Sequence, residues 1–423
     1  MNVDTPNLIP VQNSFSITNG ELRQFGLDLN KCSLKMVDNF EQLRQTPPNM
    51  VIAQSRYDLK FTQNRFKVQE LKKNFKYVMS LGVYNQLKFD PYKKKKALVP
   101  ATMKFSKIYK PYIGQNLTNK TLLVWRTGGI GDLLFIQPSL RYLKELYPSC
   151  YIKFACGPQY QALVDNWDCI DELLTLPFNV NHLIESDYHA TFEGVIERCK
   201  DAHKTCSYVL FSKWLGLDIP SEKLHPIIKP KKDKVDEVKK ILSNYCIPHK
   251  DFITVQIRAS SPIRTPSVDF WKESINYLTC AGYRVIITDS PRMSEWIDGF
   301  IKTLKNQQLC FNFSKHSTTL DYSIALISLS KLVIGTDSSM LHIAGALDVP
   351  LYGIYGPFLG EIRLSTIKRA KWVNAQSKCA PCFIHSHKPC PNSTKNGDSS
   401  CFLNIDIPKV MGEAIQFLKD CDK

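Results

Sequence analysis

Two turns rich in glycine and hydroxyl side chains carry most of the residues in this chain that could do chemistry. The first, RTGGIGD at 126–132, directly follows an apolar run. Its glycines let the backbone approach a ligand, and free amides at a helix start favour an anion. Asp132 then stands where a partly desolvated carboxylate can take a proton from a hydroxyl. The turn lacks the spacing of a dinucleotide fingerprint or a P-loop, so a tight turn capped by Asp132 is an equal interpretation of this motif alone.

The second turn, GTDSSMLH at 335–342, also joins an apolar run to a helix. Unpaired amides at such a helix start can hold a diphosphate, and hydroxyl groups add donors. A lone histidine on a helix is more often structural than catalytic, but the polar start of an otherwise apolar helix favours a binding site. The predicted ligand-binding residues of this turn are Thr336, Asp337, Ser338, Ser339 and His342.

A cysteine group near the end of the chain could hold a metal. Cys379, Cys382, Cys390 and Cys401 fall within a loop that contains proline and glycine. Four thiolates can enclose one tetrahedral ion, zinc or iron, and stiffen a loop that has no core. His385 and His387 are substitute ligands, and free thiols or disulfides are the alternatives.

The surrounding pattern predicts the elements that position these turns. From residue 120 onward, short apolar runs alternate with amphipathic segments, which is typical of parallel sheets covered by helices. A second such series starts near residue 252, so we expect two doubly wound domains that face each other across a cleft. Residues 64–80 are the one helix candidate of the preceding region, because the spacing of Phe66, Leu71, Phe75 and Val78 fits one face of a helix. The predicted divisions are an N-terminal extension of unknown fold at 1–118, a first α/β domain at 119–240, a second α/β domain at 241–378, and a cysteine loop with a C-terminal helix at 379–423.

The amino-acid composition limits the class of protein and the partners that can be expected for it. The 423 residues are 43% hydrophobic, which is enough for buried cores, and carry a formal charge of +16. Most of that charge falls in residues 1–120, with 20 Lys and Arg against 8 Asp and Glu. We expect an anionic partner for this region or, equally, a solvated surface. Apolar runs are too short for a membrane span and the start does not resemble a signal peptide, so the expected location is the cytoplasm, with peripheral attachment at the inner membrane face as an option.

The two turns, in this order and about one domain apart, resemble glycosyltransferase family nine, the heptosyltransferases of lipopolysaccharide assembly. That family reads Gly-Gly-x-Gly-Asp near its beginning and Asp-Ser-Gly-Pro-x-His near its end, and GTDSSMLHIAGALDVPLYGIYGP matches most of the second motif. The resemblance covers residues 121–357. Ser339 and Met340 replace the family's Gly-Pro.

The resemblance implies a GT-B fold, inversion at the anomeric carbon and catalysis without a metal. It also implies that 119–240 is the acceptor-side domain and 241–378 the nucleotide-sugar-binding domain. Asp132 would be the general base that deprotonates the acceptor hydroxyl. The donor would be a nucleotide-sugar, with ADP-heptose as the expected one, and the acceptor a saccharide or a protein. Donor contacts would come from both turns, including Gly129 and Gly131 of the first.

The segment QIRASSPIR at 256–264 lies where that family carries a hydroxyl residue followed by a basic one. The leaving nucleoside diphosphate develops negative charge, which fixed guanidinium groups stabilise best where water is excluded. We therefore assign Ser260 and Arg264 to the donor phosphates, with Arg258 as a helper. Asp289 and Glu295 are candidates for the ribose hydroxyls.

The cysteine group resembles the motif of autotransporter heptosyltransferases, which binds iron and supports structure. A function from another class is also open: a binding or structural protein that keeps the fold and attaches through its basic extension. The intact Asp132 and the polar turn at 336–339 favour the enzyme, whereas the missing Gly-Pro and the large extension favour the binding protein.

Overall fold

The computed structural model describes residues 8–10, 50–63, 67–165, 167–384, 388–394 and 398–422, with backbone alone at 8–10, 62, 63, 67, 68, 197 and 198. Its contacts divide the chain into two compact units, each of which is described by itself. Unit 1 holds Met1–Gly128, Ser139–Ala202 and Leu210–Ile219. Unit 2 holds Gly129–Pro138, His203–Val209 and Pro220–Lys423, so the chain passes from unit 1 to unit 2 in the first glycine-rich turn.

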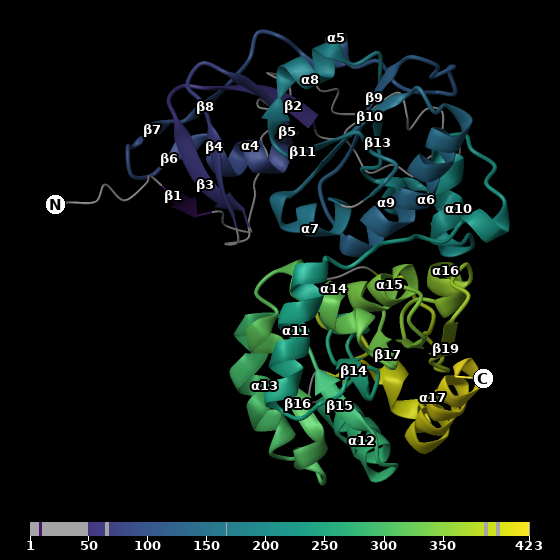
Figure 1. The fold of residues 1–423 in the computed structure, drawn as a ribbon. Coiled ribbons are helices and arrows are strands. Elements are labelled where there is room, and N and C mark those ends of the chain that lie inside the picture. Colours follow the sequence, from purple (N-terminus) through teal and green to yellow (C-terminus); the bar gives the residue numbers. More distant parts are fainter. Residues whose placement is uncertain are drawn as a thin grey trace. The chain divides into compact units, whose positions relative to one another are not determined.

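Unit 1 contains a parallel four-stranded sheet in the order β11-β10-β9-β13 (Figure 1). The strands are β9 (Thr121–Arg126), β10 (Tyr151–Cys156), β11 (Glu172–Thr175) and β13 (Tyr188–Thr191). Residues 122–126 of β9 are all buried, as a central strand covered on both faces requires. The short apolar runs of the sequence thus correctly predict these strands.

The N-terminal region adds a second sheet to unit 1, in the order β12-β5-β2-β8. These strands are β2 (Met50–Ser55), β5 (Lys76–Ser80), β8 (Leu98–Pro100) and β12 (Phe178–Asn179). Because β12 lies after residue 119, this sheet draws on both sides of the predicted division at 118. One buried cluster likewise joins Ile52 and Phe105 to Leu123 and Trp125. The extension and the first α/β sheet therefore share a core.

The helix predicted over 64–80 is wrong for the residues that the structure describes. The chain there forms β4 (Lys67–Leu71), which pairs with β3 (Leu59–Gln63), and β5, which pairs with β2. Phe66, one member of the proposed helical face, lies outside the described residues. Leu71 and Val78 are buried whereas Phe75 is 52% exposed at the turn between the strands. The backbone groups of these residues pair with β3 and β2, whereas a lone helix would have paired them within the segment.

Unit 2 is built on a fully parallel six-stranded sheet in the order β16-β15-β14-β17-β18-β19. In chain order its strands are β14 (Phe252–Gln256), β15 (Arg284–Ile287), β16 (Cys310–Asn312), β17 (Leu332–Thr336), β18 (Leu351–Tyr355) and β19 (Ala370–Asn374). This is the doubly wound order. Starting from β14, the chain adds β15 and β16 on one side and then returns to add β17, β18 and β19 on the other, so the order reverses between β14 and β17. Ligands of such sheets bind beyond the carboxyl ends of the strands at this switch point.

Helices cover both faces of the unit 2 sheet (Figure 1). Val285 and Ile287 of β15 face a cluster shared with α12 (Val268–Cys280), α13 (Ser294–Ile301) and α17 (Ile407–Cys421). Ile286, between them, faces a cluster shared with α11 (Lys232–Asn244) and α14 (Leu320–Ser328). The predicted division at 240 falls inside α11. The fold class predicted from the sequence, paired α/β units with parallel sheets, is confirmed.

No helix in the described part of the chain combines the length and the apolar character that crossing a membrane would need.

Candidate active site

The switch point of unit 2 brings together three of the sequence motifs. Gln256 at the end of β14 pairs in register with Gly335 of β17, so the loops that follow these strands emerge side by side. One loop carries Ser260 and Arg264, and the other carries Asp337 and Ser338. The polar side chains of both loops thus meet at the position where a parallel sheet binds its ligand.

Arg264 bridges the two loops. Its Nη1 donates to the Asp337 carbonyl at 3.0 Å and lies 3.3 Å from the Asp337 carboxylate, while its Nη2 donates to Ser260 Oγ at 2.9 Å. Thr336 Oγ1 donates to the Arg264 carbonyl, and Ser338 Oγ donates to Gln256 Oε1. The structure therefore brings together the predicted pair Ser260 and Arg264 and fixes it on the second turn.

Asp337 is buried, with 2% of its surface exposed. A second guanidinium, that of Arg363, lies 3.8 Å from its other carboxylate oxygen. Burial alone would raise the pKa of Asp337, but Arg363 and Arg264 outweigh it and hold that pKa below its usual value. Asp337 is thus a buried anion that orients two arginines, and two cations against one carboxylate leave an excess of positive charge at the switch point.

Arg363, in α16 (Gly360–Leu364), is a residue that the sequence motifs do not reveal. It is 5% exposed, donates to Ser207 Oγ at 2.8 Å, and lies over the rings of Phe358 and Phe135 at 5.1 and 5.9 Å. No sequence signal singles it out, because an arginine in a short helix after a strand is most often on the surface. It connects the Asp337 turn to the first helix of the glycine-rich motif.

That helix, α6 (Ile130–Leu146), begins in unit 2. Gly131 packs against His342 so closely that a Cβ at Gly131 would lie 3.0 Å from the imidazole Cδ2. Phe135 meets the same ring edge-on, with 4.9 Å between centroids. The two turns recognised in the sequence are therefore neighbours in unit 2.

Asp132 lies in the first turn of α6 and is partly exposed. Its carboxylate folds back over Gly129, whose φ of +86° only glycine adopts readily, and a Cβ at Gly129 would lie 2.0 Å from Asp132 Oδ2. Asp132 is also close enough to His342 to affect the imidazole electrostatically. The glycine thus makes room for the carboxylate that the sequence singled out.

His342 is a buried neutral base, 4% exposed. Burial lowers its pKa to about 4, although the carboxylates of Asp337 and Asp132 oppose that effect. Within the described residues, its Nδ1 and the hydroxyls of Tyr208 and Tyr355 have no hydrogen-bond partner. A neutral imidazole in this place supports α6 by packing rather than by charge.

The start of the first turn, which lies in unit 1, is held by an acid, Glu193, that no sequence motif reveals. The Thr127 amide donates to the Glu193 carboxylate, and Arg126 Nε donates to the Gly128 carbonyl at 3.1 Å. Arg126 Nη1 lies 4.0 Å from Glu193. Glu193 follows β13, the neighbour of β9, so the end of a predicted strand was the signal that could have found it.

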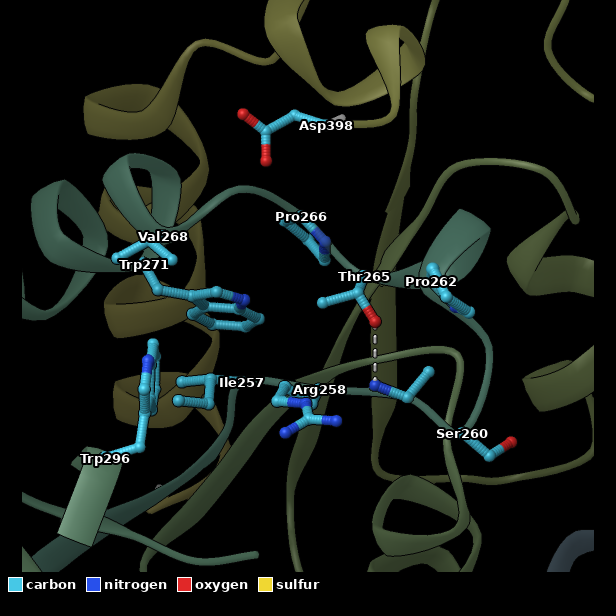
Figure 2. A pocket seen from close by; sticks show the side chains of 11 residues that line it. Ile257, Arg258, Ser260, Pro262, Thr265, Pro266, Val268, Trp271, Trp296 and Asp398 are labelled. Carbon is cyan, nitrogen blue, oxygen red and sulfur yellow. Dashed lines mark hydrogen bonds between the residues drawn. The ribbon is translucent and has the colours of Figure 1, made fainter. Parts of the chain in front are cut away.

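A pocket of about 280 Å³ opens beside the switch point of unit 2 (Figure 2). In Figure 2 the indoles of Trp271 and Trp296 lie on the same side of it, and Thr265 accepts a 3.1 Å hydrogen bond from the Ala259 amide. Arg258 and Ser260 also line the pocket, as does Asp398 of the cysteine loop. A flat aromatic wall with polar groups at its rim suits a base or sugar ring.

The two ribose candidates lie outside this lining. Glu295 is exposed in the first turn of α13, and its neighbour Trp296 lines the pocket instead. Asp289 is partly buried after β15, where burial raises the pKa of its carboxyl group.

The four cysteines of the predicted metal loop gather in unit 2. Burial, with the thiols of Cys390, Cys379 and Cys382 nearby, raises the pKa of Cys401 to about 12. Every cysteine that the structure describes is a free thiol. Among the described residues, no group of three or more ligating side chains is placed so as to hold a metal. His385 and His387 lie outside the described residues.

The second half of the chain is similar to a known protein family. Residues 205–393 match the model of glycosyltransferase family 9 (heptosyltransferase). The chain is heptosyltransferase-like. The match includes β14 to β19, hence the Arg264–Asp337 bridge and Arg363. Lipopolysaccharide heptosyltransferase 2 of Salmonella typhimurium is 32% identical over 152 residues, which are 36% of this chain and only 41% of that relative.

Solved structures support the same fold. The E. coli ADP-heptose lps heptosyltransferase II matches with a TM-score of 0.56 at 16% identity, over 72% of this chain and all of that one. The iron-containing dodecameric glycosyltransferase TibC from enterotoxigenic E. coli matches with a TM-score of 0.52 at 14% identity, over 92% of this heptosyltransferase-like chain and 99% of TibC. At these identities the likeness concerns the fold alone.

Proposed function

We propose that this protein transfers a sugar from a nucleotide-linked donor to a hydroxyl group of an acceptor, with inversion at the anomeric carbon. The observation that carries the proposal is the packing of the Asp132 turn against His342, next to the bridge between Arg264 and Asp337. A base and a cationic phosphate site are the two parts that such a transfer needs.

Asp132 is the general base in this proposal. Its carboxylate is partly exposed, so an acceptor hydroxyl can reach it, and Gly129 and Gly131 keep side chains out of its way. The base removes the hydroxyl proton while the oxygen attacks the anomeric carbon, and the bond to the diphosphate breaks. General base catalysis contributes roughly 10²- to 10⁴-fold to such a step.

Arg264 and Ser260 receive the negative charge that develops on the leaving diphosphate, and the exposed Arg258 assists. The excess positive charge around Asp337 supports this assignment, because guanidinium groups fixed in a buried network stabilise an anion without reorganising. The pocket beside them holds the nucleoside, with Trp296 against the base. Four buried residues support this site from its inner side: Thr336, Asp337, Ser338 and His342.

The names of the relatives support a proposal for the substrates. ADP-heptose is the proposed donor and a lipopolysaccharide saccharide the proposed acceptor, because the Salmonella relative and the E. coli structure are named for that transfer. A protein acceptor is the second option.

The direct test is turnover of ADP-heptose by the full chain with heptose-deficient lipopolysaccharide, compared between wild type and Asp132→Asn. We expect the variant to bind donor normally and to lose at least about 100-fold in kcat. If both proteins bind ADP-heptose and neither transfers it, the chain is a binding protein that retains the fold.

The cysteine loop is proposed as a structural metal site made by Cys379, Cys382, Cys390 and Cys401. A set of four sulfur donors suits zinc or iron, and the other three thiols lie within electrostatic range of Cys401. A bound ion would stiffen a loop of little regular structure. Elemental analysis of purified protein tests this: the Cys379→Ser plus Cys382→Ser variant should lose the metal and melt at a lower temperature, whereas Cys246→Ser, at an exposed thiol, should do neither. A metal-free wild type would refute the site.

A further inference from the structure

A lysine-rich hairpin in unit 1 has no part in the proposed transfer. Its strands are β6 (Phe89–Asp90) and β7 (Lys95–Lys96), which pair antiparallel. The turn between them completes a run of four lysines at 93–96. Two aromatic side chains stand out beside that run, Phe89 at 49% exposure and Tyr92 at 66%.

A buried carboxylate holds the turn in shape. Asp90 is fully buried and accepts hydrogen bonds from the amides of Tyr92 and Lys93, at 2.9 and 3.1 Å, and from the Tyr57 hydroxyl at 2.8 Å. Burial would raise the pKa of Asp90, but these bonds outweigh it and keep that pKa below its usual value. Asp90 therefore stays ionised inside the hairpin, where its charge organises the turn.

The ring of Tyr57 also contacts two of the lysines. The Nζ atoms of Lys93 and Lys95 lie 4.1 and 4.8 Å from the centroid of the Tyr57 ring, within the range of cation–π attraction. An ordinary solvated run would spread its like charges apart, whereas this hairpin concentrates them beside two exposed aromatic rings.

Few carboxylates lie near the lysines along the described part of the chain. Residues 50–100 contain 12 Lys and Arg against 3 Asp and Glu. Besides Asp90, the acids are Glu70, which pairs with Lys72 at 3.0 Å, and Asp58, which accepts from the Lys73 amide. Among the described residues, no carboxylate forms an ion pair with Lys94, Lys95 or Lys96.

We propose that this hairpin docks the protein on an anionic lipid surface. Lysines attract acidic headgroups, and aromatic rings favour the boundary between headgroups and acyl chains. Nucleic acid suits the site less well, because single strands are bound in a basic groove and these lysines cap a two-stranded hairpin. The proposal is independent of glycosyl transfer, so either can fail without the other.

The test is sedimentation of the full chain with vesicles of equal parts phosphatidylglycerol and phosphatidylcholine, beside vesicles of phosphatidylcholine alone. The test variant changes Lys93 to Lys96 to glutamine. The control variant changes four exposed lysines of unit 2 to glutamine and has the same net charge: Lys232, Lys239, Lys240 and Lys302. Melting temperatures check that both fold, which is expected because the Asp90 bonds use backbone amides.

Each lysine near an acidic surface contributes about fivefold to binding, so the hairpin variant should bind at least about 100-fold more weakly while the control stays close to wild type. Phe89→Ala plus Tyr92→Ala should weaken binding that persists at high salt, where charge attraction is screened. Equal losses in the two lysine variants, no binding of wild type to the anionic vesicles, or removal of wild type from them by a DNA 20-mer at equal phosphate would each overturn the proposal.

Discussion

The buried charge network of unit 2 makes a strong prediction for Asp337→Asn. The substitution keeps the shape of the side chain and removes the one carboxylate that lies 3.3 Å from Arg264 and 3.8 Å from Arg363. The buried Arg363 and the partly buried Arg264 then lose this counter-charge. Removing one partner from a buried ion pair costs about 3–5 kcal/mol of unfolding free energy.

Calorimetry of the full chain measures this effect, because the unit 2 transition should shift. For a unit of this size each kcal/mol lowers the melting temperature by about 2–4 °C, so we expect a fall of roughly 6–20 °C. Asp251→Asn is the matched control. It also removes an aspartate paired with an arginine, Arg284, but their side chains are 50% and 40% exposed, and such pairs contribute only about 0–1 kcal/mol. Equal shifts in the two variants would show that the network is no more than a surface ion pair.

Three further predictions concern the site residues. His342 is neutral in the fold, where its pKa is about 4, but would bind a proton near pH 6.5 when unfolded. Its contribution to the free energy of unfolding is therefore complete above pH 6.5 and falls by about 3 kcal/mol as the pH drops to 4. In His342→Gln the stability of unit 2 should no longer fall between pH 6.5 and 4. His189→Gln, at a buried histidine of unit 1, should leave the unit 2 transition unchanged. An unaltered pH dependence in His342→Gln would exclude His342 as its source. Gly129→Ala should displace the Asp132 carboxylate and lower kcat more than donor affinity, as measured by steady-state kinetics, and normal kcat would contradict the close approach. Trp296→Ala should weaken ADP binding, measured by calorimetry, about 5- to 150-fold, which is the range for stacking of a base on an aromatic ring. Unchanged affinity would show that the nucleoside binds elsewhere.

The sequence predicts the unit 2 sheet well because its strands are buried on both faces. Runs such as Phe252–Gln256 and Leu332–Thr336 are apolar, short and bounded by turns, and a local pattern suffices to recognise them. The polar ends of these runs fall at the switch point for the same reason. The positions of Arg264 and Asp337 beyond neighbouring strands could thus be expected, although the ion pair between them could not.

Two features depend on distant parts of the chain and escaped prediction. Residues 67–80 form strands because β2 and β3 offer partners, whereas the spacing of Leu71, Phe75 and Val78 equally fits a helix. Arg363 joins the site through Phe135, Ser207 and Asp337, which no local spacing connects. Buried charge networks are assembled by tertiary packing, so their members carry no motif.

The most direct test of the central claim measures heptose transfer from ADP-heptose by wild type and by Asp132→Asn, with donor affinity determined separately for each. The account predicts transfer by the wild type, a loss of at least about 100-fold in kcat for the variant, and equal affinity for ADP-heptose. Transfer by the variant at the wild-type rate would contradict the assignment of Asp132 as the base.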